Sequence, residues 1–251
     1  MDIYELARQN QQSAWKVLED TCIIEAWERI GATVHLVGSL RTGLLAKSRD
    51  IDIHIYTDRL DVGESFSVIR ELAERLPLQE IQYRNLIHTE EECMEWHALY
   101  KDREQNTWKF DMIHIRKGSR YDGVVEKATA AIAERLTPEI RKTILQIKFD
   151  VPDGVTIPGI EIYHAVFTGG IGTYKELEEW RKTNQLADSL GSVAVGFRNL
   201  RGRYQDFLLY GWLPLYCWHL TCLGCFSGDC SQYRCSLPAG KQFPCLENLV
   251  G

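Results

Sequence analysis

The sequence predicts an α/β (α+β) fold, in which a small mixed sheet flanked by helices is followed by a mostly helical lobe. Three observations support this prediction. Short apolar runs that end at glycine or polar turns recur up to about residue 118 and predict strands. Longer segments between them carry apolar residues at helical spacing. After Lys117-Gly118 helical patterns dominate, which suggests a second lobe and a cleft between the two.

The strands are predicted where apolar residues cluster or alternate over short runs. The last two strands flank the polar link 102–106 and predict a hairpin. One or two helical turns over residues 40–46 join the first two strands, with Ser39 as their N-cap. The predicted strands are residues 33–37, 51–56, 81–87, 94–100 and 107–115.

The helices are predicted from apolar positions that recur along one face. The first has a break near Asp20-Thr21 and stops at Gly31, and Pro77 ends the next. Thr137 and Pro138 suit the N-cap and the first position of a later helix. The predicted helices are residues 2–30, 64–76, 123–136, 138–149, 160–167, 174–183 and about 186–210.

Composition divides the chain into three parts and limits its partners. Residues 1–118 are mixed α/β, residues 119–216 are helical, and residues 217–251 form a tail rich in cysteine and glycine. The hydrophobic content of 45% is that of an ordinary globular protein. The net charge is −6, whereas proteins that bind long nucleic acids usually carry a basic excess. A long nucleic-acid partner is therefore disfavoured.

The tail contains four cysteines at nearly the spacing of a zinc knuckle, a module that binds nucleic acid. A cysteine stands where the knuckle has histidine, and Phe226 and Asp229 stand where it has glycines. Free thiols or an atypical end of the chain are the favoured interpretations over structural zinc. The four cysteines are Cys222, Cys225, Cys230 and Cys235.

A membrane partner is also disfavoured. Residues 207–228 contain no Asp, Glu, Lys or Arg, and they are long enough to cross a bilayer. Gly211 and Pro214 interrupt the apolar pattern, so we interpret the segment as a buried terminal helix. The first residues lack the basic segment and apolar run of a signal peptide. We therefore expect a cytoplasmic protein.

The chemistry of the chain is concentrated between residues 37 and 55. Asp50 and Asp52 open the second predicted strand and follow Gly38-Ser39 closely. Alternate side chains of a strand share a face, so the two carboxylates point the same way, about 7 Å apart. Without a cation they repel each other. A divalent metal removes that repulsion, and oxygen-only ligands suit Mg²⁺ or Mn²⁺.

The Gly38-Ser39 pair lies where a strand turns into a helix and predicts a phosphate site. Free N–H groups at such a turn bind anions, Gly38 allows close approach, and Ser39 adds a hydroxyl. Arg41 is a candidate for a forked contact with a triphosphate, or else a surface salt bridge. Lys47 is a weaker candidate for the same contact. With the aspartates, the turn predicts a site for a metal-bound nucleoside triphosphate.

A third carboxylate, Asp111, lies in the middle of a later strand whose alternate members are apolar. A charged side chain in that position needs either an electrostatic partner or a functional role. If its strand lies beside residues 51–56, Asp111 joins the aspartate pair, where it can bind one metal and orient or deprotonate an attacking hydroxyl. The alternative is an edge-strand charge paired with Lys109 or Arg116. His54 shares the face of the pair, and we interpret it as a hydrogen-bonded structural histidine.

Together these residues resemble the DNA polymerase beta-like nucleotidyltransferase superfamily. Its signature is an apolar residue, Gly, Gly or Ser, then about ten residues, then Asp-apolar-Asp or Glu, and a later third carboxylate. Here Val37-Gly38-Ser39, Asp50-Ile51-Asp52 and Asp111 fit it. The local Gly-Ser-Leu-Arg-Thr-Gly is similar to small bacterial members that modify antibiotics or proteins. The resemblance covers about residues 30–118.

The resemblance implies a role for each part of the motif. Asp50 and Asp52 would ligate both metals, and Asp111 the metal nearer the nucleophile. Ser39 and the amides around Gly38 would hold the β- and γ-phosphates. The enzyme would use Mg²⁺ to move a nucleoside monophosphate from a nucleoside triphosphate (NTP) to a hydroxyl-type acceptor and release pyrophosphate.

It also implies that residues 1–118 are the catalytic domain and that residues 119–216 bind the acceptor, a small molecule or a protein. Two alternatives stay open. A nucleotide or RNA acceptor is supported by the tail and by an arginine cluster at residues 198–203. A non-catalytic nucleotide-binding module is disfavoured, because such a module has little use for three converging acids. The NTP, the acceptor and the oligomeric state stay undetermined by the sequence.

Overall fold

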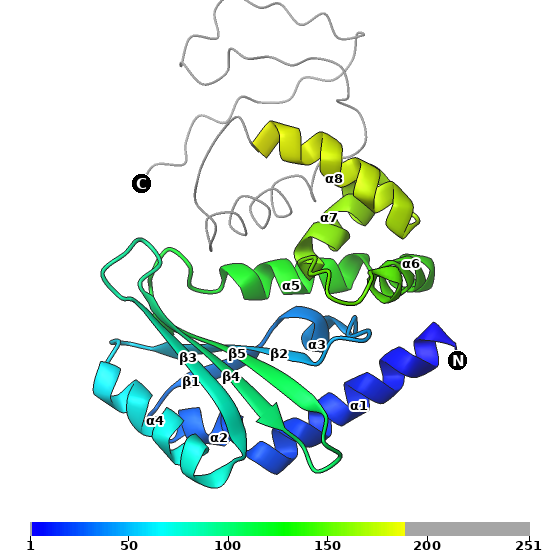
Figure 1. Ribbon diagram of the computed structural model, residues 1–251. Coiled ribbons are helices and arrows are strands. Elements are labelled where there is room, and N and C mark those ends of the chain that lie inside the picture. The colour runs from blue at the N-terminus through cyan, green and yellow to red at the C-terminus, as the bar shows by residue number, and fades with distance from the viewer. Residues whose placement is uncertain (1, 189–251) are drawn as a thin grey trace, which may run out of the picture. The chain divides into compact units, whose positions relative to one another are not determined.

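The computed structural model describes the backbone of residues 2–188 (Figure 1). Its strands are β1 (Thr33–Leu36), β2 (Asp50–Thr57), β3 (Leu78–Leu86), β4 (Cys93–Lys101) and β5 (Thr107–Arg116). Its helices are α1 (Ile3–Thr21), α2 (Ile23–Glu28), α3 (Gly38–Thr42), α4 (Val62–Arg75), α5 (Val124–Arg135), α6 (Pro138–Asp150), α7 (Gly159–Gly169) and α8 (Tyr174–Asp188).

The five strands form one mixed sheet in the order β1-β2-β5-β4-β3. Strands β2 and β5 pair in parallel, and the other neighbours are antiparallel. The predicted hairpin is confirmed as β4–β5. The predicted fold class is confirmed as well, since this sheet is flanked by helices and the described chain after it is helical.

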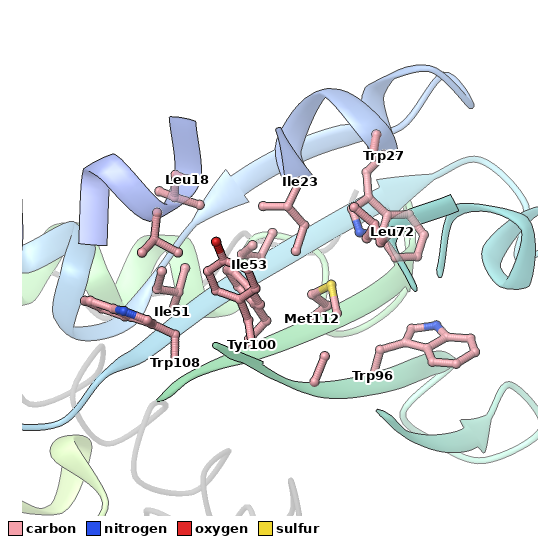
Figure 2. Close-up of a cluster of buried hydrophobic side chains, with 14 of the residues drawn as sticks. Leu18, Ile23, Trp27, Ile51, Ile53, Leu72, Trp96, Tyr100, Trp108 and Met112 are labelled. Carbon is pink, nitrogen blue, oxygen red and sulfur yellow. The ribbon is translucent and has the colours of Figure 1, made fainter. Parts of the chain in front are cut away.

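One face of the sheet is apolar and packs against α1, α2 and α4 (Figures 1 and 2). Because side chains alternate along a strand, β2 directs Ile51 and Ile53 into this core and Asp50 and Asp52 to the opposite face. Both isoleucines are completely buried, and each buried side chain of this size contributes about 1.5–3 kcal/mol. The core therefore fixes the register that brings the acids to the other face.

Several helix ends lie where the sequence predicts them. The break in the first predicted helix is confirmed at Cys22, whose φ of 47° is left-handed. Thr137 caps α6 by accepting a hydrogen bond from the N–H of Ile140. Asp61 caps α4 through the N–H of Glu64 at 3.0 Å, so this helix begins slightly before the predicted residue 64.

The prediction for the turn after β1 is wrong in two respects. The helix α3 is shorter and earlier than residues 40–46, and its N-cap is Val37 rather than Ser39. Ser39 lies inside the helix, which begins at Gly38. The Thr42 side-chain hydroxyl donates to the Gly38 carbonyl at 3.0 Å. The Ser39 hydroxyl is thereby released from capping and points to the helices that follow the sheet.

A second core joins the helices after the sheet to the start of the chain. Ile144 and Ile147 of α6 pack in it with Leu44, which comes from the loop after α3. Ile3 and Ala7 of α1 also belong to this core, although the end of α1 packs in the first core. The helix α1 thus links the two cores. The division of the chain at residues 118 and 216 stays a prediction.

In the described residues, no helix is both long and apolar enough to cross a bilayer. Several predictions fall outside these residues. They concern most of the helix 186–210, the arginine cluster, the apolar segment 207–228 and the four tail cysteines.

Candidate active site

The structure brings the three predicted acids together on one face of the sheet. Asp50 and Asp52 lie on β2, and Asp111 lies on the neighbouring strand β5. In the parallel register Asp52 is opposite Asp111, and Asp50 is opposite Lys109. The condition set by the sequence, that the strand of Asp111 lies beside the strand of the pair, is met.

The nearby cations do not fully offset the repulsion among the three carboxylates. Burial, and then the charges of Asp111 and Asp50, raise the pKa of Asp52 to about 7. Burial and the charge of Asp111 also raise the pKa of Asp50. Lys109 and Lys148 counteract these shifts only in part. The three acids are half-buried and form a set of oxygen donors that a divalent cation would stabilise.

Asp111 differs from the pair because both of its oxygens are bound. His97 on β4 hydrogen-bonds to Oδ1 through Nδ1, and Lys109 Nζ lies 2.9 Å from Oδ2. Burial would raise the pKa of Asp111, but these two partners lower it below its usual value. Its hydrogen bond to Asp111, followed by contact with Glu95, raises the pKa of His97 to about 9.

The alternative interpretation of Asp111 is therefore half right. Asp111 does pair with Lys109, but β5 is a central strand rather than an edge strand. Arg116 instead pairs with Glu92. Only 21% of the Asp111 side chain is exposed, and its two partners compensate for the lost solvation of its charge.

The donor set fits a hard divalent cation by its chemistry, which is carboxylate oxygen throughout. Within residues 2–184, no three His, Cys, Asp or Glu side chains converge tightly enough to hold a metal as they stand. Asp111 is held by His97 and Lys109. Asp50 and Asp52 are the acids whose raised pKa values a bound cation would lower.

Gly38 joins the predicted phosphate turn to the acids. Its φ is +65°, and a Cβ atom built on it would lie 2.9 Å from the Asp52 carboxyl carbon. Only glycine tolerates both the conformation and the contact. The two halves of the motif, separate in sequence, are therefore in direct contact in the fold.

Two residues at this site were not anticipated from the sequence. Lys148 Nζ of α6 lies 2.8 Å from both Ser39 Oγ and the Leu44 carbonyl oxygen. The Tyr163 hydroxyl of α7 lies 3.1 Å from Ser39 Oγ. Lys148 is also one of the groups that lower the pKa values of Asp50 and Asp52. No local pattern marks either residue, because Lys148 is one of several charged residues of α6 and Tyr163 belongs to the buried core of the later helices.

The other predicted phosphate contacts are placed differently. Arg41 is exposed on α3. Lys47 lies 3.0 Å from Asp153 and donates to the Val151 carbonyl, so it ties its loop to the end of α6. These positions leave Lys148 as the cation in contact with Ser39 among the described residues.

His54 is part of a separate polar group. Its Nδ1 lies 3.0 Å from Glu126 Oε1, which also accepts a hydrogen bond from the Tyr56 hydroxyl at 2.8 Å. Because Glu126 belongs to α5, the group fastens that helix to β2. This arrangement supports the interpretation of His54 as a hydrogen-bonded structural histidine.

The geometry agrees with a comparison against known families. Residues 21–117 match the model of the nucleotidyltransferase domain. These residues form a nucleotidyltransferase domain. The match spans the whole sheet and all three acids, and it confirms the family resemblance drawn from the motif. No curated protein matches the sequence significantly.

Solved structures show a distant likeness. The non-canonical poly(A) polymerase complex GLD-2–GLD-3 is 12% identical, with a TM-score of 0.47 and coverage of 67% of this chain and 60% of that chain. A Cid1 poly(U) polymerase bound to MgATP is 15% identical, with a TM-score of 0.48 and coverage of 65% and 53%. The chain thus spans little more than half the length of these proteins, and likeness at this level does not bear on its substrate.

Proposed function

We propose that the protein is a Mg²⁺-dependent nucleotidyltransferase that moves a nucleoside monophosphate from an NTP to a hydroxyl of a small molecule or protein and releases pyrophosphate. The contact between Gly38 and Asp52, with Asp111 in register beside them, carries this proposal. It joins a phosphate-binding turn, a metal-binding pair and a third acid in one place. The nucleotidyltransferase domain match supports the reaction class.

The phosphates of the NTP would lie at the turn formed by Gly38 and Ser39. Lys148 supplies an ammonium group next to the Ser39 hydroxyl, and the Tyr163 hydroxyl adds a third donor. An ammonium group and hydroxyls are suitable partners for phosphate oxygens. In this proposal Lys148 takes the role that the sequence assigned to Arg41 and Lys47.

Asp50, Asp52 and Asp111 would hold the metal. When bound, Mg²⁺ would neutralise the acids and the charge that develops on the transferred phosphoryl group. Asp111 would also orient the acceptor hydroxyl and take its proton. His97 and Lys109 hold the two oxygens of Asp111, so they position it for both tasks.

The direct test is nucleotide-dependent pyrophosphate release. The 251-residue chain is incubated with ATP, GTP, CTP or UTP and MgCl₂, and NTP binding is followed in parallel by calorimetry. We expect at least one NTP to bind in a Mg²⁺-dependent way and to yield pyrophosphate. The double variant Asp50→Asn/Asp52→Asn should retain its fold by circular dichroism and lose both signals.

Three results would contradict the proposal. If none of the four NTPs binds, the protein has no nucleotide site of the proposed kind. Tight binding without pyrophosphate release, with water or any tested acceptor, would favour the non-catalytic alternative. Full activity of the double variant would show that the acids do not hold the metal.

A further inference from the structure

A hollow of about 240 Å³ lies beside Asp111, on the side away from β2. We name it the β3–β4 hollow. Its lining comes from three neighbouring strands and consists of Glu80, Gln82, His97, Ala98, Leu99 and Lys109. In the sheet register, His97 is opposite both Asp111 and Gln82. The hollow therefore opens on the same face of the sheet as the acids.

The order of the strands arranges the site along a line. The phosphate turn follows β1, the aspartate pair lies on β2, Asp111 lies on β5, and the β3–β4 hollow comes next. In phosphoryl transfer the attacking and leaving oxygens lie on opposite sides of the phosphorus. If pyrophosphate leaves toward the turn after β1, the attacking group must approach from the side of β5 and β4.

We propose that the β3–β4 hollow binds the acceptor, and that the acceptor is a small, non-anionic molecule rich in hydroxyl groups. This inference rests on the proposed function. The acceptor oxygen forms a bond to the α-phosphorus of the NTP while the bond from that phosphorus to the bridging oxygen breaks. Pyrophosphate leaves with the electron pair, and the hydroxyl proton passes through Asp111 to water.

The charges around the hollow decide against a phosphate-rich acceptor. Lys109 is already paired with Asp111 at 2.9 Å, and Arg84 with Glu95 at 3.2 Å. Each pair neutralises the cation that a nucleic-acid phosphate would need. The imidazole of His97, whose pKa is raised to about 9, is matched by Asp111 and Glu95, and the exposed carboxylate of Glu80 adds a further negative charge. The hollow therefore offers no excess of positive charge for the phosphates of an RNA strand.

The polar groups and the size of the hollow suit a hydroxylated ring. Glu80, Gln82 and His97 offer both donors and acceptors for hydroxyl groups, and Leu99 offers an apolar surface for the C–H face of a ring. Pockets for drug-sized ligands span roughly 300–1,000 Å³. A hollow of about 240 Å³ is a fit for one ring rather than for an extended chain.

The test fills the hollow and compares acceptors. Pyrophosphate release is measured at saturating NTP and Mg²⁺ with a panel of monosaccharides, amino sugars and nucleosides, and with a 15-nucleotide single-stranded RNA. Leu99→Trp and, independently, the exposed Gln82→Trp place an indole in the hollow. Ile81→Trp is the matched control, because Ile81 is 38% exposed and lies on the other face of β3.

We expect transfer to at least one small compound and no extension of the RNA. Either filling variant should raise the acceptor KM at least tenfold and leave the NTP KM unchanged, whereas Ile81→Trp should change the acceptor KM less than twofold. The inference is overturned if the RNA is the better acceptor. It is also overturned if both filling variants leave the acceptor KM unchanged, or if water is the only acceptor used.

These outcomes are distinct from failure of the proposed function. If pyrophosphate is released but the acceptor KM is the same in the filling variants as in the wild type, the proposed function holds and only this acceptor site is contradicted. An enzyme that releases no pyrophosphate under any condition, water included, contradicts the proposed function itself.

Discussion

At the scale of single residues, the site is a set of acids held close together against their own repulsion. Asp52 is enclosed between Gly38, Asp50 and Asp111, and its pKa is raised to about 7. The neighbouring cations relieve this repulsion unequally. Lys109 bonds directly to Asp111, whereas Lys148 acts on the Asp50–Asp52 pair only through its charge. The protonation of Asp52 can therefore be followed through the stability of the protein.

The first prediction concerns the pH dependence of the free energy of unfolding. The pKa of Asp52 rises from its usual 3.8 to about 7 in the folded protein. Between these values the folded protein holds a proton that the unfolded chain has lost, so stability falls as pH rises. Asp52→Asn should therefore stabilise the metal-free protein little near pH 4 and by about 2–4 kcal/mol at pH 7 and above.

Urea unfolding in EDTA across this pH range measures the effect. The matched control is Asp58→Asn, which removes an exposed acid just beyond the same strand. A difference between wild type and Asp52→Asn that does not grow with pH would contradict the assigned pKa.

The second prediction separates backbone strain from contact at Gly38. Gly38 and Gly31 both have positive φ, +65° and +80°, but a Cβ on Gly31 meets nothing within 4 Å. Alanine at either position should cost about 1–2 kcal/mol of stability through strain. Only Gly38→Ala should also displace Asp52 and weaken NTP binding by at least tenfold. Equal NTP affinity in the two variants, measured by calorimetry with Mg²⁺, would show that the contact with Asp52 does not matter.

At the scale of elements, α6 is the helix that holds the turn after β1. Lys148 bonds to Ser39 and to the Leu44 carbonyl, and Arg141 donates to the carbonyls of Thr42 and Gly43. The last carbonyls of the short helix α3 are thus bound by side chains of α6, which compensates for a helix too short to be stable alone. The position of the Gly38-Ser39 turn depends on this distant helix.

The third prediction tests the contribution of α6. Lys148→Met keeps the length of the side chain and removes its charge, and Lys142→Met makes the same change on an exposed position of the same helix. We expect Lys148→Met to raise the NTP KM at least tenfold and to raise the pKa of Asp52, because Lys148 lowers it. Lys142→Met should do neither. Steady-state kinetics and the stability–pH profile of each variant give the two readouts.

At the scale of the whole molecule, two cores are joined by α1. Ala14, Val17 and Leu18 belong to the core under the sheet, while Ile3 and Ala7 belong to the core of the later helices. The Tyr4 hydroxyl also donates to the Pro138 carbonyl at 2.7 Å, at the start of α6. Because α1 packs in both cores, unfolding of one core removes packing contacts from the other and destabilises it.

The fourth prediction is that the two cores unfold together. Ile53 and Ile147 are fully buried, one in each core. Alanine at either position should lower the free energy of unfolding by about 2–4 kcal/mol. Both variants should shift one common urea transition, seen alike by tryptophan fluorescence and far-UV circular dichroism. Two separate transitions, each moved by only one variant, would show that the cores are independent.

Much of the fold could be predicted because its signals are local. The strands and helices of the first 118 residues follow apolar periodicity, and caps such as Thr137 are read from neighbouring residues. The turn at Ser39 could not be predicted correctly, because the residue is freed from capping by contacts with α6 and α7. At this position, tertiary hydrogen bonds override the local preference of serine for the N-cap.

The sequence by itself was enough to predict the nucleotidyltransferase domain that the family comparison confirms. The spacing of Gly38-Ser39, Asp50-Ile51-Asp52 and Asp111 is a short-range pattern, and the side-chain alternation of a strand makes it a convergent set of acids. Only the tertiary structure decided which cation contacts Ser39 and where a hollow lies beside the acids. Lys148 is separated from Ser39 by more than a hundred residues, and the β3–β4 hollow exists only because three strands pair in register. Such juxtapositions leave no trace in local sequence.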